Sequence, residues 1–227
     1  MPPSALEPGD PNAQRRVVLV DGADRELGES EILDAHVLPG TKHRAFTALL
    51  FREDGALLLA RRAADKFLWA GHWDGTVASH PMPGEGYAAA GERRMPEELG
   101  IECALSEHGR FDYHMPYGEV GAENEVCATL VGLLPQDVEL RPVAGEISEV
   151  RWITCEQMLA ELSVAGSGYC PWLALALLCL AQERASLSPE QEVWLGPWCD
   201  ATSRAREAIE ASLRADFPDQ EWHLLGR

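Results

Sequence analysis

Strand-like and helix-like stretches alternate along this chain, and their order constrains the fold more than any other feature of the sequence. Residues 43–51 and 56–60 are apolar stretches on either side of Glu53-Asp54-Gly55, which predicts a β-hairpin. Residues 87–99 have helical spacing, and Gly100 is a suitable C-cap. Further strands are expected at 17–20, 125–133 and 147–153, and further helices at 156–162 and 171–184. This alternation predicts an α/β fold with a mixed sheet flanked by helices.

The chain has 227 residues, 46% of them hydrophobic, which suits one domain or one domain plus an extension. We expect a flexible leader over residues 1–14, a catalytic domain over 15–185 and a helical C-terminal extension over 186–227. The leader is rich in proline, glycine and acidic residues and lacks the layout of a secretory signal. In the extension, Trp194, Trp198 and Trp222 flank a helical pattern at 202–213, and we expect it to pack against the main domain.

Charge and cysteine content limit the classes of partner. A formal net charge of −18 repels nucleic acid and anionic membranes, so neither is expected to bind. No apolar stretch approaches the ~18 residues that a membrane span needs. The six cysteines form no Cys-x-x-Cys pair, which favours free thiols in a reducing compartment. We therefore expect a cytoplasmic monomer or homodimer, in which any phosphate-bearing substrate meets local cations or a metal ion.

Three histidines and two glutamates form the strongest candidate site in the sequence. They are His36, His43, His80, Glu123 and Glu125. The two glutamates are two positions apart, which places both carboxylates on one face of a strand. Together the five side chains offer a complete nitrogen and oxygen ligand set for one divalent metal ion. Each residue alone is more often an ordinary surface or core residue, so the prediction depends on the whole set.

Residues 79–101 resemble the Nudix box, in which a glycine and a glutamate precede the pattern Arg-Glu-apolar-x-Glu-Glu-x-Gly-apolar. The chain matches this pattern at Glu85, Arg93, Met95, Glu97, Glu98, Gly100 and Ile101. Two positions depart from it, because Ser79 replaces the glycine and Arg94 replaces the glutamate after the first arginine. The resemblance implies a Nudix-type fold. Since the replaced glutamate is normally a metal ligand for hydrolysis, Arg94 argues against ordinary Nudix hydrolysis.

The wider sequence, over roughly residues 15–184, is similar to type I isopentenyl-diphosphate isomerase, a branch of the same superfamily. The matching stretches are His36 and His43 with the following Arg-Ala-Phe, residues 57–63 followed by Lys66, Trp73 with Ser79-His80-Pro81, Glu98-Leu-Gly100, Phe111-Asp-Tyr113, residues 123–127, and Pro171-Trp172. This resemblance implies a metal-dependent enzyme of isoprenoid biosynthesis that protonates an alkene of a small prenyl diphosphate.

Carried over by position, the resemblance implies that the five residues of the candidate set hold one Mg²⁺, Mn²⁺ or Zn²⁺. It implies that Glu98 helps to hold a second Mg²⁺, which arrives with the diphosphate. The diphosphate itself would be bound by three cations, Arg62, Lys66 and Arg94. Ile32 stands at about the place where the family usually has a further lysine, so we expect the grip on the diphosphate to be weaker or shifted.

The resemblance also assigns the catalytic groups. Glu125 matches the family's acid, Tyr113 stands beside it, and the ring of Trp172 matches one that stabilises a tertiary carbocation through its π face. On the other face of the substrate the family uses a cysteine thiolate. This chain has Ala78 at that position, and a methyl group cannot accept a proton.

Several explanations of Ala78 stay open. An engineered substitution is one, but Asp74, Gly75 and Ser79 also differ from the isomerase norm, which favours natural divergence. In the leading hypothesis the acid half protonates an alkene, and Asp74, Ser79, water or ring closure quenches the cation. The alternatives are a Nudix-type diphosphate hydrolase, which would split the diphosphate, and a non-catalytic binding module, which would bind metal without turnover.

Overall fold

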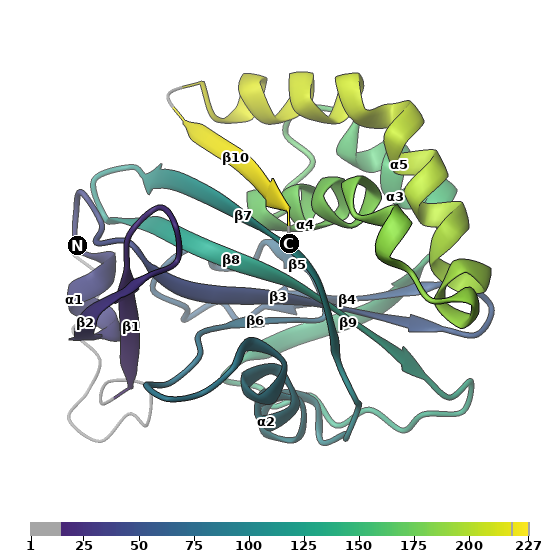
Figure 1. Cartoon of the computed structure of the whole chain (residues 1–227), viewed down its shortest axis with the longest axis horizontal. Helices are drawn as coiled ribbons and strands as arrows, with labels where there is room; N and C mark the ends of the chain where they lie inside the picture. Colours follow the sequence, from purple (N-terminus) through teal and green to yellow (C-terminus); the bar gives the residue numbers. More distant parts are fainter. Residues whose placement is uncertain (1–14, 219, 227) are drawn as a thin grey trace.

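The computed structural model describes residues 15–218 and 220–226, and in these residues ten strands form one mixed sheet (Figure 1). The strands are β1 (Arg16–Val20), β2 (Glu26–Glu31), β3 (His43–Arg52), β4 (Leu57–Arg62), β5 (Trp73–Asp74), β6 (Val77–Ser79), β7 (Ser106–Tyr117), β8 (Gly121–Leu134), β9 (Ile147–Ile153) and β10 (Glu221–Gly226). Their main order is β10-β7-β8-β3-β1-β2, with β4 and β6 also paired to β3. Among the described strands β3 and β8 run parallel and the other pairs are antiparallel, so the expected mixed sheet is confirmed.

Helices cover both faces of the sheet, and Figure 1 shows α2 on one side and α3, α4 and α5 on the other. The helices are α1 (Ile32–His36), α2 (Tyr87–Leu99), α3 (Cys155–Leu162), α4 (Pro171–Gln182) and α5 (Pro189–Asp216), with a 3₁₀ turn at Arg184–Ser186. Strand β3 is apolar on both faces for this reason. Ala45 and Leu49 join the core under α4, whereas Phe46 and Ala48 join the core under α2.

Local sequence signals explain where the helices begin and end. Helix α2 ends at Gly100, which adopts the left-handed conformation (φ 67°) of the predicted C-cap. Helix α3 begins with a capping box between Thr154 and Gln157. The expected helix at 171–184 is observed, but it ends at Gln182. All six cysteines are free, as expected, and Cys127 and Cys179 are buried.

The C-terminal region is largely one long helix that packs on the sheet through α3 and α4. Helix α5 begins with a capping box at Ser188 and includes the expected stretch at 202–213. Trp198 is buried, and its indole nitrogen donates to the carbonyl oxygen of Gly55 in the β3–β4 turn, at 2.8 Å. The chain then adds β10 to the sheet edge beside β7, a strand that the sequence did not predict. The leader at 1–14 lies outside the described residues, and the domain bounds stay a prediction.

In the described part of the chain, no helix combines the length and apolar character that crossing a membrane would require.

Candidate active site

The five predicted ligands lie on four elements that the sheet brings together. His36 ends α1, His43 begins β3, His80 follows β6 directly, and the two glutamates lie in β8. The parallel pairing of β3 and β8 places His43 opposite Glu125 in register. The pairing of β6 with β3 then brings the end of β6, and with it His80, to the same edge.

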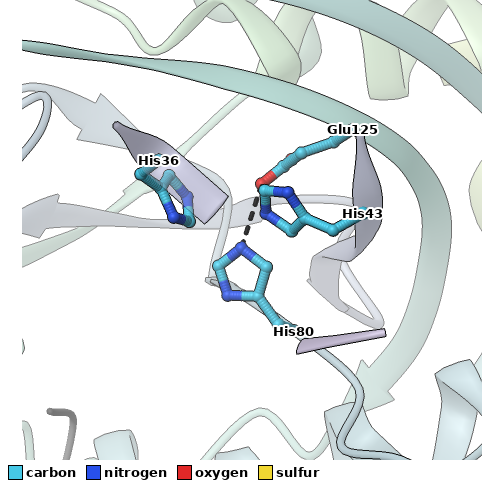
Figure 2. A group of neighbouring side chains, drawn as sticks. All are labelled: His36, His43, His80 and Glu125. Atoms are coloured by element: carbon cyan, nitrogen blue, oxygen red, sulfur yellow. Dashed lines mark hydrogen bonds and ion pairs between the residues drawn. The ribbon is translucent and has the colours of Figure 1, made fainter. Parts of the chain in front are cut away.

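The imidazoles of the three histidines meet around Glu125, as Figure 2 shows. One ligand atom from each of His36, His43, His80 and Glu125 lies within 4.8 Å of the others. Oε1 of Glu125 is 3.0 Å from Nε2 of His80 and 3.4 Å from Nε2 of His43. The carboxylate of Glu123 stands beside this group, with its Oε2 2.9 Å from Nε2 of His36. The structure thus brings together all five predicted ligands.

Backbone carbonyls orient two of the rings. Nδ1 of His36 lies 2.6 Å from the carbonyl oxygen of Ile32, and Nδ1 of His43 lies 2.7 Å from that of Thr41. A carbonyl oxygen can only accept, so Nδ1 carries the proton in both rings. The Nε2 atoms therefore face the cluster, which is the arrangement by which metal-binding histidines are usually held.

The electrostatics of the cluster reflect close packing of charged groups away from water. Burial opposes charge on His36, but the carboxylate of Glu123 outweighs it and raises the pKa of His36 to about 9. For His80 burial dominates and lowers the pKa. Burial would raise the pKa of Glu125, yet the imidazoles of His43 and His80 hold it well below its ordinary value.

These residues fit a divalent metal ion. Nε2 of His43 is fully buried and has no hydrogen-bond partner in the described structure, although three polar side chains surround it. A buried nitrogen of this kind is costly unless something binds it. Imidazole nitrogens and carboxylate oxygens are a donor set that suits Zn²⁺, Mn²⁺ and related divalent ions. The cluster therefore has both the ligands and an unsatisfied atom that a cation would satisfy.

The cluster forms one end of a cavity of about 180 Å³. Ten of the predicted site residues line it: His36, His80, Glu123, Glu125, Tyr113, Ala78, Trp172, Arg62, Lys66 and Arg94. His43 is buried in the cluster itself. Glu98 lines a smaller adjoining cavity of about 20 Å³ together with Asp74, and this small cavity shares Ala78 with the larger one. The predicted catalytic, diphosphate-binding and metal-binding groups thus surround two neighbouring cavities that share lining residues.

An acid and an aromatic ring lie next to each other in this space. The hydroxyl of Tyr113 donates to Oε2 of Glu125 at 2.5 Å, because the two residues are register partners in β7 and β8. Burial and the neighbouring carboxylates raise the pKa of Tyr113 well above its ordinary value, so it stays protonated. The ring of Trp172 lies 6.2 Å from that of Tyr113, centroid to centroid. The indole nitrogen of Trp172 donates to Oδ1 of buried Asp74 at 2.7 Å, which fixes the ring.

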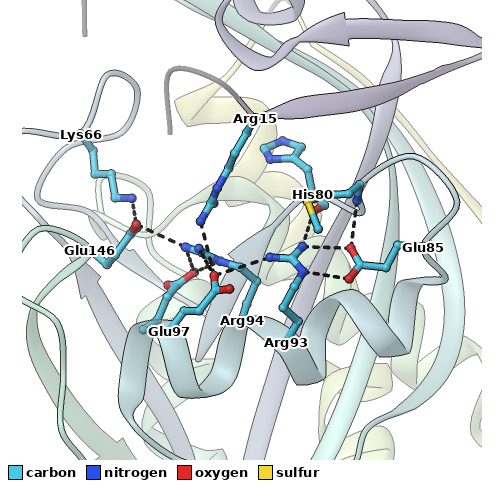
Figure 3. A network of polar contacts seen from close by, with 10 residues as sticks. Arg15, Lys66, His80, Glu85, Arg93, Arg94, Glu97 and Glu146 are labelled. Carbon is cyan, nitrogen blue, oxygen red and sulfur yellow. Dashed lines mark hydrogen bonds and ion pairs between the residues drawn. The ribbon is translucent and has the colours of Figure 1, made fainter. Parts of the chain in front are cut away.

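Every predicted diphosphate-binding cation already has a carboxylate partner, and Figure 3 shows the pairs of Lys66 and Arg94. Arg62 lies 3.5 Å from Oδ2 of Asp74. Lys66 contacts Glu146, which also lies 3.3 Å from Arg94.

Arg94 is almost fully buried and contacts Glu98 at 2.5 Å and Glu97 at 2.6 Å. Burial raises the pKa of Glu98 to about 7. The cations were predicted from the sequence, but their pairing with carboxylates was not.

Asp74 and Ser79 are the two side chains that could replace the missing thiolate. Ala78 opposes Thr47 in β3, on the strand face that also carries His43. Ser79 opposes Phe46, whose ring packs in the core under α2. Ser79 nevertheless lines the larger cavity together with Ala78, whereas Asp74 lines only the smaller cavity that shares Ala78. Of the two, Asp74 carries the carboxylate, which is a stronger base than a hydroxyl.

Several cavity residues were not predicted from the sequence, and two of them, Glu146 and Arg15, form ion pairs with neighbouring side chains. Glu146 ends a turn before β9, and Arg15 precedes β1. Neither belongs to a motif, and each reaches the cavity only through contacts with residues about 80 positions away. A sequence pattern could not have revealed them.

Comparison with known proteins places this chain among close relatives. Residues 41–173 match the model of the NUDIX domain family. The isopentenyl-diphosphate Delta-isomerase of Haloarcula marismortui is 41% identical over 182 residues, covering 78% of this chain and 97% of the relative. That of Nocardia farcinica is 39% identical over 162 residues, covering 71% and 91%. A crystal structure of DR0079 from Deinococcus radiodurans has a TM-score of 0.57 at 24% identity, covering 73% of this chain and 99% of that one, which shows a shared fold.

Proposed function

Because the chain belongs to the NUDIX domain family, and within it to the isopentenyl-diphosphate Delta-isomerases, we propose that it isomerises isopentenyl diphosphate. The reaction adds a proton to the alkene at one carbon and removes a proton from another, and it leaves the diphosphate intact. One observation supports this proposal above the others. The hydrogen-bonded pair of Tyr113 and Glu125 lies inside the cavity, beside an aromatic ring and the histidine cluster.

Glu125 and Tyr113 act together as the proton donor. One exchangeable proton lies between Oε2 of Glu125 and the phenol oxygen of Tyr113, at a separation of 2.5 Å. The other carboxylate oxygen, Oε1, faces the imidazoles. We assign protonation of the alkene to this pair rather than to one residue, because tightly coupled groups share their titration.

His36, His43, His80, Glu123 and Glu125 would hold one divalent ion, Mg²⁺, Mn²⁺ or Zn²⁺. When bound, such an ion would supply positive charge next to the Tyr113–Glu125 pair and so favour transfer of the pair's shared proton to the substrate. Glu98 is proposed to help to hold a second Mg²⁺ that arrives with the diphosphate.

Trp172 is proposed to stabilise the carbocation that protonation creates. Its ring lines the cavity beside Tyr113, and its hydrogen bond to Asp74 holds the ring in one orientation. An indole face attracts a nearby cation, most strongly where water is excluded. The ring therefore lies where charge develops, next to the donor pair.

Arg62, Lys66 and Arg94 are proposed to bind the diphosphate. All three line the cavity, which gives an otherwise acidic chain a local group of cations. An arginine guanidinium can donate hydrogen bonds to two phosphate oxygens at once, whereas a lysine ammonium group acts as a point charge. Because each cation is paired with a carboxylate, the diphosphate must take over these contacts, and the second Mg²⁺ would compensate the displaced acids.

Asp74 is assigned the role of proton acceptor in place of a thiolate. It borders the small cavity behind Ala78, and burial raises its pKa, which favours uptake of a proton. Its carboxylate also lies at the Nε1 edge of Trp172, so the proton would leave close to the ring that stabilises the cation.

A diphosphate hydrolase of the NUDIX family is the alternative function, and Arg94 makes it the weaker one. Hydrolases of this family use carboxylates of the Nudix box to hold metal ions. Here the Arg94 guanidinium lies among Glu97, Glu98 and Glu146 and engages all three carboxylates. A cation in that position competes with the metal ions that hydrolysis needs.

Incubation with isopentenyl diphosphate and Mg²⁺ in heavy water separates these functions. An isomerase introduces deuterium into the hydrocarbon and releases no phosphate, and the Glu125→Gln variant should lose this labelling. Glu119→Gln, an exposed change at the β7–β8 turn, is the matched control and should label normally. Phosphate release without label would establish the hydrolase, and metal binding without either product would indicate a binding module.

A further inference from the structure

We propose that Arg15, the residue before β1, is a fourth cation of the diphosphate-binding group. This inference rests on the proposed function and adds a binding residue to it. Arg15 lines the same cavity as Lys66 and Arg94, although it lies more than 50 positions before them in the sequence. In Figure 3 its side chain extends toward Arg94 and Glu97 on α2.

The backbone of Arg15 is hydrogen-bonded to the start of α1, the helix that carries His36 of the metal cluster. Its carbonyl oxygen accepts a hydrogen bond from the amide of Ile32 at 2.9 Å. Ile32 begins α1, the helix that ends with His36, and both residues line the cavity. The pairing of β1 with β2, in which Arg16 opposes Glu31, holds this arrangement. The guanidinium therefore enters the cavity from an ordered part of the fold.

The present partner of Arg15 holds it weakly. Nη2 of Arg15 is 3.5 Å from Oε2 of Glu97, and the same oxygen lies 2.6 Å from Nη1 of Arg94. Arg93 also reaches that oxygen, at 3.5 Å. One carboxylate oxygen thus faces three guanidinium groups, and its negative charge cannot satisfy them all.

The other two arginines have further partners of their own. Arg93 forms a two-pronged bond with Glu85, at 2.8 and 2.9 Å, and Arg94 bonds to Glu98. For Arg15, the contact with Glu97 is the ion pair that the described residues provide. A guanidinium has five N–H donors, and contacts within residues 15–218 and 220–226 occupy few of those on Arg15.

A cation with few ion-pair contacts of its own is well suited to bind a diphosphate. An anion that enters beside Arg15 gains a charge-assisted bond at the cost of one long contact to Glu97. The same anion must break short contacts to recruit Lys66 or Arg94. Arg15 is only partly exposed, with 24% of its side chain accessible, so water screens its charge less than on an open surface. Redirecting Arg15 is therefore less costly than recruiting Lys66 or Arg94.

Direct binding of inorganic diphosphate in the presence of Mg²⁺, measured by calorimetry, tests the proposal without requiring turnover. Arg15→Gln should raise the Kd by about tenfold or more, as loss of a charged hydrogen bond does. It should also raise the KM for isopentenyl diphosphate while leaving kcat nearly unchanged. Arg16→Gln is the matched control, because Arg16 is exposed and pairs with Glu29 at 3.1 Å instead, and it should bind as the wild type does.

A rescue variant separates charge from structure. Ile32 lines the cavity and is backbone-bonded to Arg15, so a lysine at this position can reach the same space. Adding Ile32→Lys to Arg15→Gln should recover most of the lost affinity, whereas adding Ile32→Met should not. If Arg15→Gln lowers the unfolding temperature, this rescue decides the matter, and a Kd that Ile32→Lys leaves weak overturns the proposal.

The failure of this inference can be told from the failure of the proposed function. Wild-type affinity in the Arg15→Gln protein would remove Arg15 from the site and leave the isomerase proposal standing. A wild-type protein that binds neither inorganic diphosphate nor the substrate would overturn both. A raised Kd, an intact control and a successful rescue together would support the role of Arg15.

Discussion

The histidine cluster predicts that a divalent ion stabilises the folded protein by a measurable amount. In the absence of an ion, the buried Nε2 of His43 is unsatisfied, a condition that costs about 1–3 kcal/mol. Ion binding removes this cost and bridges α1, β3, β8 and the loop after β6, which are distant in sequence. The unfolded chain has no such cluster, so the binding free energy adds to the free energy of unfolding.

The size of the effect follows from mass action. An ion at a hundred times its Kd stabilises the folded state by about 2.7 kcal/mol. For a chain of this length, each kcal/mol raises the melting temperature by roughly 2–4 °C. Saturating metal should therefore raise the melting temperature by about 5–11 °C over the protein stripped with a chelator.

Thermal unfolding by circular dichroism, with Mg²⁺, Mn²⁺ and Zn²⁺ added in turn to stripped protein, measures this rise. His43→Gln and Glu125→Gln should abolish most of it. His223→Gln is the control, because His223 is exposed on β10, away from the cluster. The control also accounts for loose ion binding by a chain of net charge −18. If none of the ions shifts the wild type, or if the His43 variant shifts equally, the assignment of the metal site is wrong.

Two further substitutions test the proton path. Tyr113→Phe removes the hydroxyl bonded to Glu125 and should lower kcat for deuterium incorporation by about 100-fold, with metal binding retained; activity within twofold of the wild type would exclude Tyr113 from the donor pair. Asp74→Asn should also lower kcat by about 100-fold if Asp74 accepts the proton. This substitution also weakens the contact with Arg62, so thermal unfolding should be measured as a control. A stable Asp74→Asn protein with normal kcat would show that another group accepts the proton.

The regular elements were predictable where local pattern and burial agree. The hairpin of β3 and β4 is mostly apolar over residues 45–51 and 57–60, because helices cover both faces of the sheet there. Strand β7 was missed because the buried Phe111, Tyr113 and Met115 alternate with polar residues in a stretch that contains glycine and proline. Strands β2 and β10 were missed because they are largely polar or half exposed, and their pairing is set by neighbours along the sheet.

In the site, too, the residue types were predictable from the sequence, whereas their interactions with distant residues were not. The metal ligands were predictable because their residue types alone define a chemistry, and β3–β8 pairing then places His43 against Glu125. The state of the cations was not predictable. Lys66 is paired by Glu146, which lies 80 positions away and reaches it through a turn before β9. Such a pair has no local sequence pattern. The charged residues of a site can therefore be predicted from the sequence, but which of them pair with one another cannot.

The alanine at position 78 is chemically compatible with an isomerase because the two proton transfers differ in difficulty. Adding a proton to an alkene creates a carbocation, so this step needs a strong donor and a ring beside it. The chain retains both, in the Tyr113–Glu125 pair and in Trp172. A carbocation, in contrast, loses a neighbouring proton readily, and a weak base suffices. Restoring a thiol with Ala78→Cys should therefore change the rate far less than Glu125→Gln, and a large gain from that thiol would mean that Asp74 does not carry the acceptor step.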